Sequence, residues 1–279
     1  MTRFLIVTDL DGSLLDHYTY SAAPAIPLLK ELHESDVPVV LCSSKTRAEM
    51  KQLRRRLGLS TPYIVENGAA VFIPSEGSFK RPKDTESVEG DWCHRFGPGR
   101  RHWLNLLETL PSKLDNSWRG FSDLTIHQIA DFTGLSKDDA ALAAAREFGE
   151  PVQWLGTPAE QEQWCAWLEE RGAKILRGGR FLHVAGPWDK GMALQWLRDA
   201  LAAAPSDSVA EQEPLVTIAL GDSHNDIAML EAADYAVVIR SPVHPPPPVS
   251  GQHRVYVTRA TGPLGWVEGI RHWQQQLSF

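Results

Sequence analysis

The sequence predicts an α/β protein in which a doubly wound parallel sheet forms the core and a second α/β domain is inserted into it. Short apolar runs rich in Val, Ile and Leu recur along the chain. Helical patterns separate several of them, which is typical of parallel strands joined by crossover helices. Between about residues 84 and 186 the pattern changes to several helices, which indicates the insertion. A chain of 279 residues with 43% hydrophobic residues is long enough for both parts.

The core is predicted from residues 1–83 and 187–279. Continuous apolar runs are typical of strands buried on both faces, and such runs occupy residues 4–8, 37–42, 64–73, 215–220, 235–239 and 254–257. Helices are predicted at residues 22–35, 45–57, 189–203 and 223–232. Residues 204–214 and 241–250 are predicted to be surface loops, and the second contains four consecutive prolines.

The inserted domain is predicted from residues 84–186. Its helices are expected at residues 100–110, 122–132, 137–148 and 158–171, and its strands near 151–155, 173–177 and 180–185. Ser136 and Asp139 resemble a capping box, and Thr157-Pro158 places proline at the first position of a helix. These two helix starts support the assignment locally.

Composition narrows the class of partner. The formal net charge of −7 includes no long basic run, which argues against nucleic-acid binding and a polybasic membrane anchor. Cys42, Cys93 and Cys165 lie far apart without a C-x-x-C, which argues against a disulfide framework and a zinc site. The first apolar run is too short for a signal-peptide core, and no stretch approaches the roughly 18 apolar residues of a membrane span. We expect a soluble, cytoplasmic protein that binds a small molecule.

Two predicted strands run directly into acidic residues. Asp9 and Asp11 follow the first strand, and on an extended backbone both side chains would point to the same side, where open α/β sheets bind ligands. Asp222 follows strand 215–220, and Asp226 lies nearby in a predicted helix. Carboxylates from separate strand ends suit a hard cation such as Mg²⁺. Taken singly, the two motifs are also compatible with an Asp-rich turn and a helix cap.

A serine and a lysine accompany these acids. Ser43 follows strand 37–42, and its hydroxyl can donate to a phosphate, although serine is also an ordinary N-cap. Lys190 lies at a predicted helix N-terminus, where a cation opposes the helix dipole unless an anion lies beside it. A solvated surface lysine is the commoner explanation for one such residue.

In chain order, four stretches resemble the motifs of the haloacid dehalogenase superfamily: Asp9–Ser13, Ser43, Asp189–Gly191 and Gly221–Asp226. Each is short, but all four occur in order, so coincidence is much less probable than for any single motif. The insertion lies between the second and third motifs. In this it is similar to the larger α/β cap of the subgroup that acts on sugar phosphates and related metabolites.

The resemblance implies a phosphatase with a Mg²⁺ cofactor. Asp9 would attack phosphorus to form an aspartyl-phosphate that water hydrolyses, and Asp11 would act as general acid and then as general base. Ser43 and Lys190 would complete the catalytic set by neutralising and aligning the phosphate. The residues implied at the metal are Asp9, Asp11, Asp222 and Asp226.

Within the superfamily the chain resembles the mannosyl-3-phosphoglycerate phosphatase family, in the stretches 11–17, 42–47, 66–69, 177–183 and 262–266. This implies hydrolysis of mannosyl-3-phosphoglycerate to mannosylglycerate and phosphate. The substrate-binding residues expected are Ser44, Lys45, Glu66, Asn67, Arg177, Gly179, Arg180 and His183. An arginine can grip the substrate carboxylate through two hydrogen bonds. The alternative is a hairpin whose arginines are solvated.

Other functions are compatible with the same motifs. A sugar phosphatase, a phosphomutase or a phosphotransferase of the same superfamily would use the same core motifs on another sugar phosphate, and product analysis separates them. A binding protein without turnover would have no reason to retain Asp9, Asp11, Lys190 and Asp222 together.

Overall fold

The computed structural model describes residues 2–115, 117–177, 181–203, 214–251 and 254–279. Their contacts divide into two compact units. Unit 1 comprises the residues up to Ser44, Arg54–Arg95 and Asp189–Phe279. Unit 2 comprises Lys45–Leu53 and Phe96–Trp188. As limits of functional domains, the boundaries at residues 84 and 186 remain a prediction.

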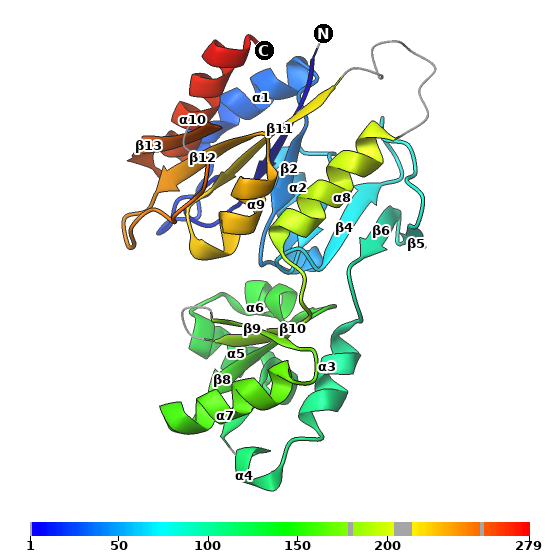
Figure 1. Cartoon of the computed structure of the whole chain (residues 1–279), viewed down its shortest axis with the longest axis vertical. Helices are drawn as coiled ribbons and strands as arrows, with labels where there is room; N and C mark the ends of the chain where they lie inside the picture. Colours follow the sequence, from blue (N-terminus) through cyan, green and yellow to red (C-terminus); the bar gives the residue numbers. More distant parts are fainter. Residues whose placement is uncertain (1, 116, 178–180, 204–213, 252–253) are drawn as a thin grey trace. The chain divides into compact units, whose positions relative to one another are not determined.

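Unit 1 is built on one large sheet, and the predicted α/β class is confirmed (Figure 1). Its described strands are β1 (Arg3–Thr8), β2 (Val39–Cys42), β3 (Tyr63–Val65), β4 (Ala70–Pro74), β5 (Glu86–Val88), β6 (Asp91–Arg95), β11 (Leu215–Gly221), β12 (Tyr235–Arg240) and β13 (Val255–Thr261). They lie in the order β13-β12-β11-β1-β2-β3-β4-β6-β5. The strands from β13 to β3 are parallel to their neighbours, whereas β4, β6 and β5 extend the sheet in antiparallel pairs.

Helices cover both faces of this sheet (Figure 1). They are α1 (Ile26–Glu34), α8 (Lys190–Ala202), α9 (Ile227–Ala232) and α10 (Gly262–Leu277), with 3-10 turns at Ala23–Ala25 and His224–Asp226. Helices α8 and α9 pack on each other and on β11, while α10 packs on β12, β13 and the first 3-10 turn. Helix α10 was not predicted, because glycines in its first turn weaken the apolar pattern there. Among the helices of the described residues, none is long and apolar enough to cross a membrane.

The single strand predicted at residues 64–73 is wrong. The chain reverses at Glu66, Asn67 and Gly68, whose φ angles are +46°, +59° and +94°, and the apolar run forms the antiparallel pair β3 and β4. Hydrophobic residues before and after the turn are buried alike, so the apolar pattern continues across it. A Cβ on Gly68 would lie 2.1 Å from the carbonyl oxygen of Asp189, so only glycine fits beside the start of α8.

Unit 2 contains a second, antiparallel sheet of order β7-β8-β10-β9 among the described residues. Its strands are β7 (Trp118–Gly120), β8 (Glu150–Trp154), β9 (Lys174–Arg177) and β10 (Leu182–Ala185). Its helices are α3 (Arg100–Leu107), α4 (Ser112–Asp115), α5 (Ile126–Thr133), α6 (Lys137–Ala144) and α7 (Pro158–Glu169), with a 3-10 turn at Phe121–Asp123. Ser136 and Thr157 cap α6 and α7 as predicted.

Two segments group differently from the prediction. Strands β5 and β6, placed by sequence in the insertion, belong to the sheet of unit 1 because β6 pairs with β4 along five residues. Residues 45–53, which include most of helix α2 (Arg47–Leu57), group with unit 2. One contact there is the Thr46 hydroxyl, which donates to the carbonyl of Leu142 over 2.8 Å.

Candidate active site

Asp9 and Asp222 lie beside each other because their strands are neighbours. Strands β1 and β11 are parallel and in register from Arg3 and Leu215 to Thr8 and Leu220. The amide of Asp9 continues this pairing and donates to the carbonyl of Leu220 over 2.8 Å. Because the carboxyl ends of parallel strands meet at one edge of a sheet, both acids project from the same edge. Both carboxylates are buried, with 6% and 3% of the residue exposed.

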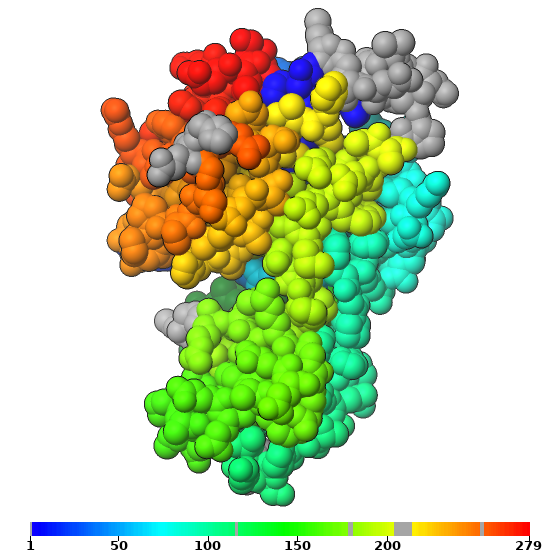
Figure 2. Space-filling view, viewed as in Figure 1, coloured from blue at the N-terminus to red at the C-terminus, as the bar shows by residue number. Residues whose placement is uncertain are grey.

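Lys190, the first residue of α8, connects two of the acids. Its Nζ donates to Asp9 Oδ1 and to Asp226 Oδ1, each over 2.6 Å. The lysine is fully buried, although the outer side of α8 forms part of the surface of unit 1 (Figure 2). Burial alone lowers the pKa of Lys190, but the charges of Asp226 and Asp9 outweigh it and hold the pKa well above its usual value. Lys190 is therefore a permanent buried cation and not a solvated lysine.

Burial is also the main influence on the pKa of Asp9. It raises the pKa of this carboxyl well above its usual value, and the charge of Asp226 adds to the effect. Lys190 opposes them, while Asp222 and Asp11 raise the pKa further. The electrostatic effect of Asp11 places it near Asp9. The extended-backbone argument for their common side does not hold, however, because β1 ends at Thr8 and the chain turns at Leu10.

Asp226 is held by the loop that follows β11. Its Oδ2 accepts hydrogen bonds from the amides of Asp222 and Ser223, over 3.1 and 3.0 Å, and its Oδ1 accepts from Lys190. Asp226 is fully buried. Both oxygens are therefore engaged in fixing the Asp222 loop and the lysine, which favours a supporting role over that of a direct metal ligand.

Asp222 has a different environment. Its Oδ1 is buried and has no hydrogen-bond partner among the described residues. Its Oδ2 lies close to Gly12, where φ is +82° and a Cβ would stand 2.4 Å from the oxygen. Burial and the charge of Asp226 raise the pKa of Asp222 to about 6, against the lowering effects of His244 and Lys190. A buried, unpartnered carboxylate oxygen is costly unless an ion or a solvent molecule satisfies it.

These features fit a divalent cation. Asp9, Asp222 and Asp226 each offer a carboxylate oxygen, and these three atoms lie within 4.8 Å of one another. Oxygen donors of this kind suit Mg²⁺. The Asp11 carboxylate is outside this group, so a contribution of Asp11 through its backbone carbonyl remains a proposal.

The predicted phosphate and substrate residues of unit 1 gather at the neighbouring strand ends. Ser43 follows β2, is almost fully buried, and accepts a hydrogen bond at its carbonyl from the amide of Asn67 over 2.9 Å. Asn67 also accepts from Asn225 over 3.1 Å, so the Glu66–Gly68 turn touches the loop that follows β11. Glu66 is buried and Ser44 half-buried. Lys45 groups with unit 2.

The predicted substrate residues of the insertion are only partly described. Gly179 and Arg180 lie outside the described residues. Arg177 ends β9, is exposed, and donates to Gln161 Oε1 over 3.0 Å. His183 lies in β10, opposite Leu176 of β9. Burial and the charge of Arg146 lower the pKa of His183 to about 3.

His183 should therefore make stability depend on pH. The unfolded chain protonates this histidine near its usual pKa of about 6.5, whereas the folded chain does not until about pH 3. As the pH falls below the first value, the unfolded state binds a proton that the folded state lacks, and stability decreases. His183→Gln should show a smaller loss of unfolding free energy between pH 7 and pH 4, measured by urea denaturation. The exposed His127 serves as a control, and a His127→Gln variant that reduced the loss equally would contradict the assignment.

Sequence reasoning missed two residues that contact the site. The Asn225 side chain donates to Asn67, and His244 Nε2 lies 3.4 Å from Asp222 Oδ2. His244 belongs to the proline-rich loop after β12, which we predicted only as a surface loop. Since β12 is the parallel neighbour of β11, the rule used for Asp222 applies to this loop as well and could have indicated it.

Two family models match parts of the chain. One, described as haloacid dehalogenase-like hydrolase, matches residues 6–89, which include Asp9, Asp11 and Ser43. The other, described as sucrose-6F-phosphate phosphohydrolase, matches residues 169–274, which include Lys190 and Asp222. The two matches lie on either side of most of unit 2.

Solved structures share this fold over nearly the whole chain. The sucrose-phosphatase of Synechocystis sp. PCC6803, solved with sucrose and phosphate, is 17% identical with a TM-score of 0.56, covering 98% of this chain and 99% of the other. BT1666 of Bacteroides thetaiotaomicron, among phosphatases of the haloalkanoate (HAD) superfamily, is 18% identical with a TM-score of 0.64, covering 97% and 95%. A haloacid dehalogenase-like hydrolase from B. subtilis is 17% identical with a TM-score of 0.60, covering 98% and 99%.

Proposed function

We propose that this chain, which belongs to the haloacid dehalogenase superfamily of hydrolases, is a phosphatase acting on a small phosphorylated metabolite. One observation carries the proposal: Lys190 joins Asp9 and Asp226 at 2.6 Å, beside the unpartnered Oδ1 of Asp222. A buried cation among two carboxylates at adjacent strand ends and a third in the turn after β11 is suited to hold a nucleophile and a phosphate dianion in one place.

In the proposed reaction Asp9 attacks phosphorus through a carboxylate oxygen, and the bond from phosphorus to the leaving oxygen breaks. Asp11 gives that oxygen its proton. Asp11 then takes a proton from water as the water attacks the aspartyl-phosphate, which releases phosphate and restores Asp9. Lys190 keeps Asp9 in place and, with Ser43, neutralises charge on the phosphoryl oxygens.

Mg²⁺ would be held by Asp9, Asp222 and the carbonyl of Asp11, and when bound it would neutralise phosphoryl charge and align the attacking and leaving oxygens. Asp226 would position Lys190 and the backbone of Asp222. This role of Asp226 is supported by the hydrogen bonds that its two carboxylate oxygens accept, one from Lys190 and the other from the amide of Asp222.

For the substrate, we propose a glycosyl 3-phosphoglycerate, most specifically mannosyl-3-phosphoglycerate, on the family resemblance stated above. The substrate carboxylate needs a cation apart from the phosphate site, and Arg180 is the candidate. A second candidate is a plain sugar phosphate, which the match of residues 169–274 to the sucrose-6F-phosphate phosphohydrolase family favours.

The function is tested by phosphate release from a panel of sugar phosphates and glycosyl phosphoglycerates. Turnover should cease in excess chelator and return with Mg²⁺, and Asp222→Ala should raise the Mg²⁺ concentration needed for half-maximal activity. Full activity in chelator would refute the metal-dependent mechanism.

Arg180→Ala should cost the glycosyl phosphoglycerate about 1.5–3 kcal/mol in kcat/KM, as for a hydrogen bond to a charged group. Equal losses for a generic phosphate ester would favour the plain sugar phosphate.

A further inference from the structure

The loop of residues 241–250 brings a histidine to the metal-site carboxylate. It follows β12, which pairs in parallel with β11 up to Val238 and Gly221. The two strands therefore end at the same edge of the sheet, and His244 reaches Asp222 from the side of β12. His244 Nε2 lies 3.4 Å from Asp222 Oδ2. Nothing in the proposed reaction uses this histidine.

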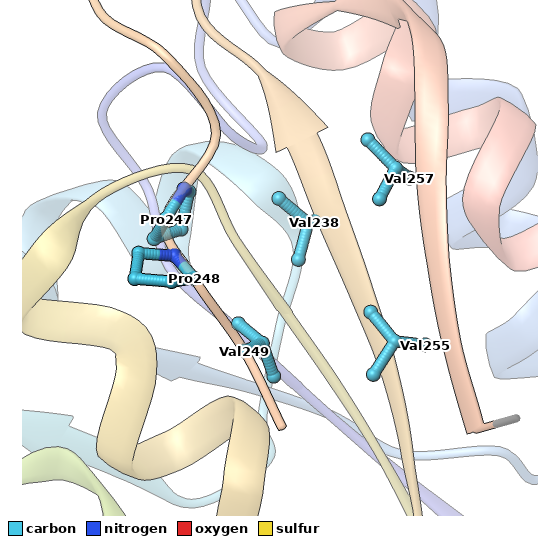
Figure 3. A pocket seen from close by; sticks show the side chains of 6 residues that line it. All are labelled: Val238, Pro247, Pro248, Val249, Val255 and Val257. Carbon is cyan, nitrogen blue, oxygen red and sulfur yellow. The ribbon is translucent and has the colours of Figure 1, made fainter. Parts of the chain in front are cut away.

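The loop has features that restrict where His244 can lie. Four consecutive prolines, at 245–248, follow the histidine and fix their own φ angles. Pro247, Pro248 and Val249 line an apolar pocket of about 280 Å³ opposite Val238 of β12 and Val255 and Val257 of β13 (Figure 3). The amide of Ser250 donates to Glu231 Oε1 over 3.1 Å, which ties the end of the loop to α9.

The two ring nitrogens of His244 face different oxygens. Its Nδ1 lies 3.1 Å from the carbonyl oxygen of Pro245, and its Nε2 lies 3.4 Å from Asp222 Oδ2. A neutral ring carries one N–H, and with that proton on Nε2 it can donate to Asp222. His244 is half-buried, with 35% of its side chain accessible. Solvent therefore reaches one side of the ring while the other faces the carboxylate.

The two oxygens of Asp222 have separate environments. Oδ2 lies between His244 and Gly12, which has no Cβ, whereas Oδ1 is buried and has no partner among the described residues. A carboxylate that ligates a metal through one oxygen is commonly oriented by a hydrogen bond to the other. Here His244 lies beside Oδ2 of Asp222, and Oδ1 is the oxygen left for a metal.

We propose that His244 is a positioning residue for metal binding: its Nε2–H donates to Oδ2 of Asp222 and leaves Oδ1 to ligate the cation. A closer approach of about 0.2–0.5 Å would bring the 3.4 Å separation to an ordinary hydrogen-bond length. The inference rests on the proposed function, because it takes Asp222 as a ligand. It assigns a role to the loop that carries the proline run.

The test measures Mg²⁺ affinity directly. Metal-stripped full-length protein is titrated with MgCl₂ by isothermal titration calorimetry. His244→Ala should weaken binding by about 10–100-fold, the usual effect of losing a residue that orients a metal ligand. His244→Gln should recover most of the affinity, because its amide can donate from nearly the same place. Val243→Ala, an exposed position in the same loop, is the matched control and should bind as the wild type does.

Two further measurements separate positioning from a purely structural role. The metal-free His244→Ala protein should unfold at the same temperature as metal-free wild type, and its kcat at saturating Mg²⁺ should remain close to wild type while the Mg²⁺ requirement rises. Unchanged affinity in His244→Ala, or a lower unfolding temperature that accounts for the loss, would overturn the proposal. So would imidazole nitrogen coupling in the pulsed EPR spectrum of bound Mn²⁺, since it would make His244 a direct ligand.

Failure of the proposed function has a different signature. In that case wild type itself would not bind Mg²⁺, and Asp222→Ala would change nothing. If wild type binds Mg²⁺, Asp222→Ala abolishes binding and His244→Ala leaves it unchanged, only the role of His244 is refuted.

Discussion

Asp9→Asn is expected to lower kcat by more than about a hundredfold, since the covalent nucleophile is lost. The amide has nearly the shape of the carboxylate but cannot attack phosphorus. Phosphate release under saturating substrate and Mg²⁺ measures the effect. Asp36→Asn is the matched control, because Asp36 is exposed and has a φ of +54°, a conformation that asparagine also tolerates.

The same substitution should leave the fold intact. Burial raises the pKa of Asp9 well above its usual value, so the buried charge is unfavourable to folding, and a neutral amide removes that cost. Lys190 keeps Asp226 as a partner. We expect the unfolding temperature to be equal to or higher than that of wild type. Activity above about a hundredth of wild type in a folded Asp9→Asn protein would show that Asp9 is not the nucleophile.

Lys190→Met should be the most destabilising of these substitutions. Methionine retains much of the length of the side chain but removes the charge that Asp9 and Asp226 share at 2.6 Å. Removing one partner from a buried ion pair costs about 3–5 kcal/mol, because it leaves an uncompensated buried charge. Urea denaturation of wild type and variant measures the difference, and turnover should be lost as well.

Two additional variants isolate the cause. In the double variant Lys190→Met/Asp226→Asn one of the two stranded charges is gone, so part of the stability should return. Lys30→Met changes an exposed lysine of α1 and should have little effect. If Lys190→Met lowered the unfolding free energy by less than about 1 kcal/mol, Lys190 would not be needed to stabilise the buried carboxylates of Asp9 and Asp226.

Local sequence patterns were sufficient to predict those strands and helices that have clear apolar runs or clear capping signals. Strands β1, β2, β11 and β12 were predictable because continuous apolar runs end abruptly in polar residues, and the capped helices α6 and α7 because Ser136 and Thr157 give specific start signals. The reversal at Glu66–Gly68 was not, since burial on both sides of the turn makes β3 and β4 one run in the sequence. Helix α10 was missed because glycines at 262 and 265 in its first turn weaken the helical pattern there.

The residues of the candidate site also divide into those that the sequence identified and those that only the structure brought together. Asp9 and Asp222 could be identified from sequence because each directly follows a parallel strand, and such strand ends meet at one edge of the sheet. The sequence could not show that Lys190 pairs with residues 181 and 36 positions away, or that His244 reaches Asp222 from the loop after β12. A lysine or histidine looks the same in a sequence whether it is solvated or buried against a carboxylate. Only the order of the strands in the sheet, which brings distant segments together, decides its partner and its charge.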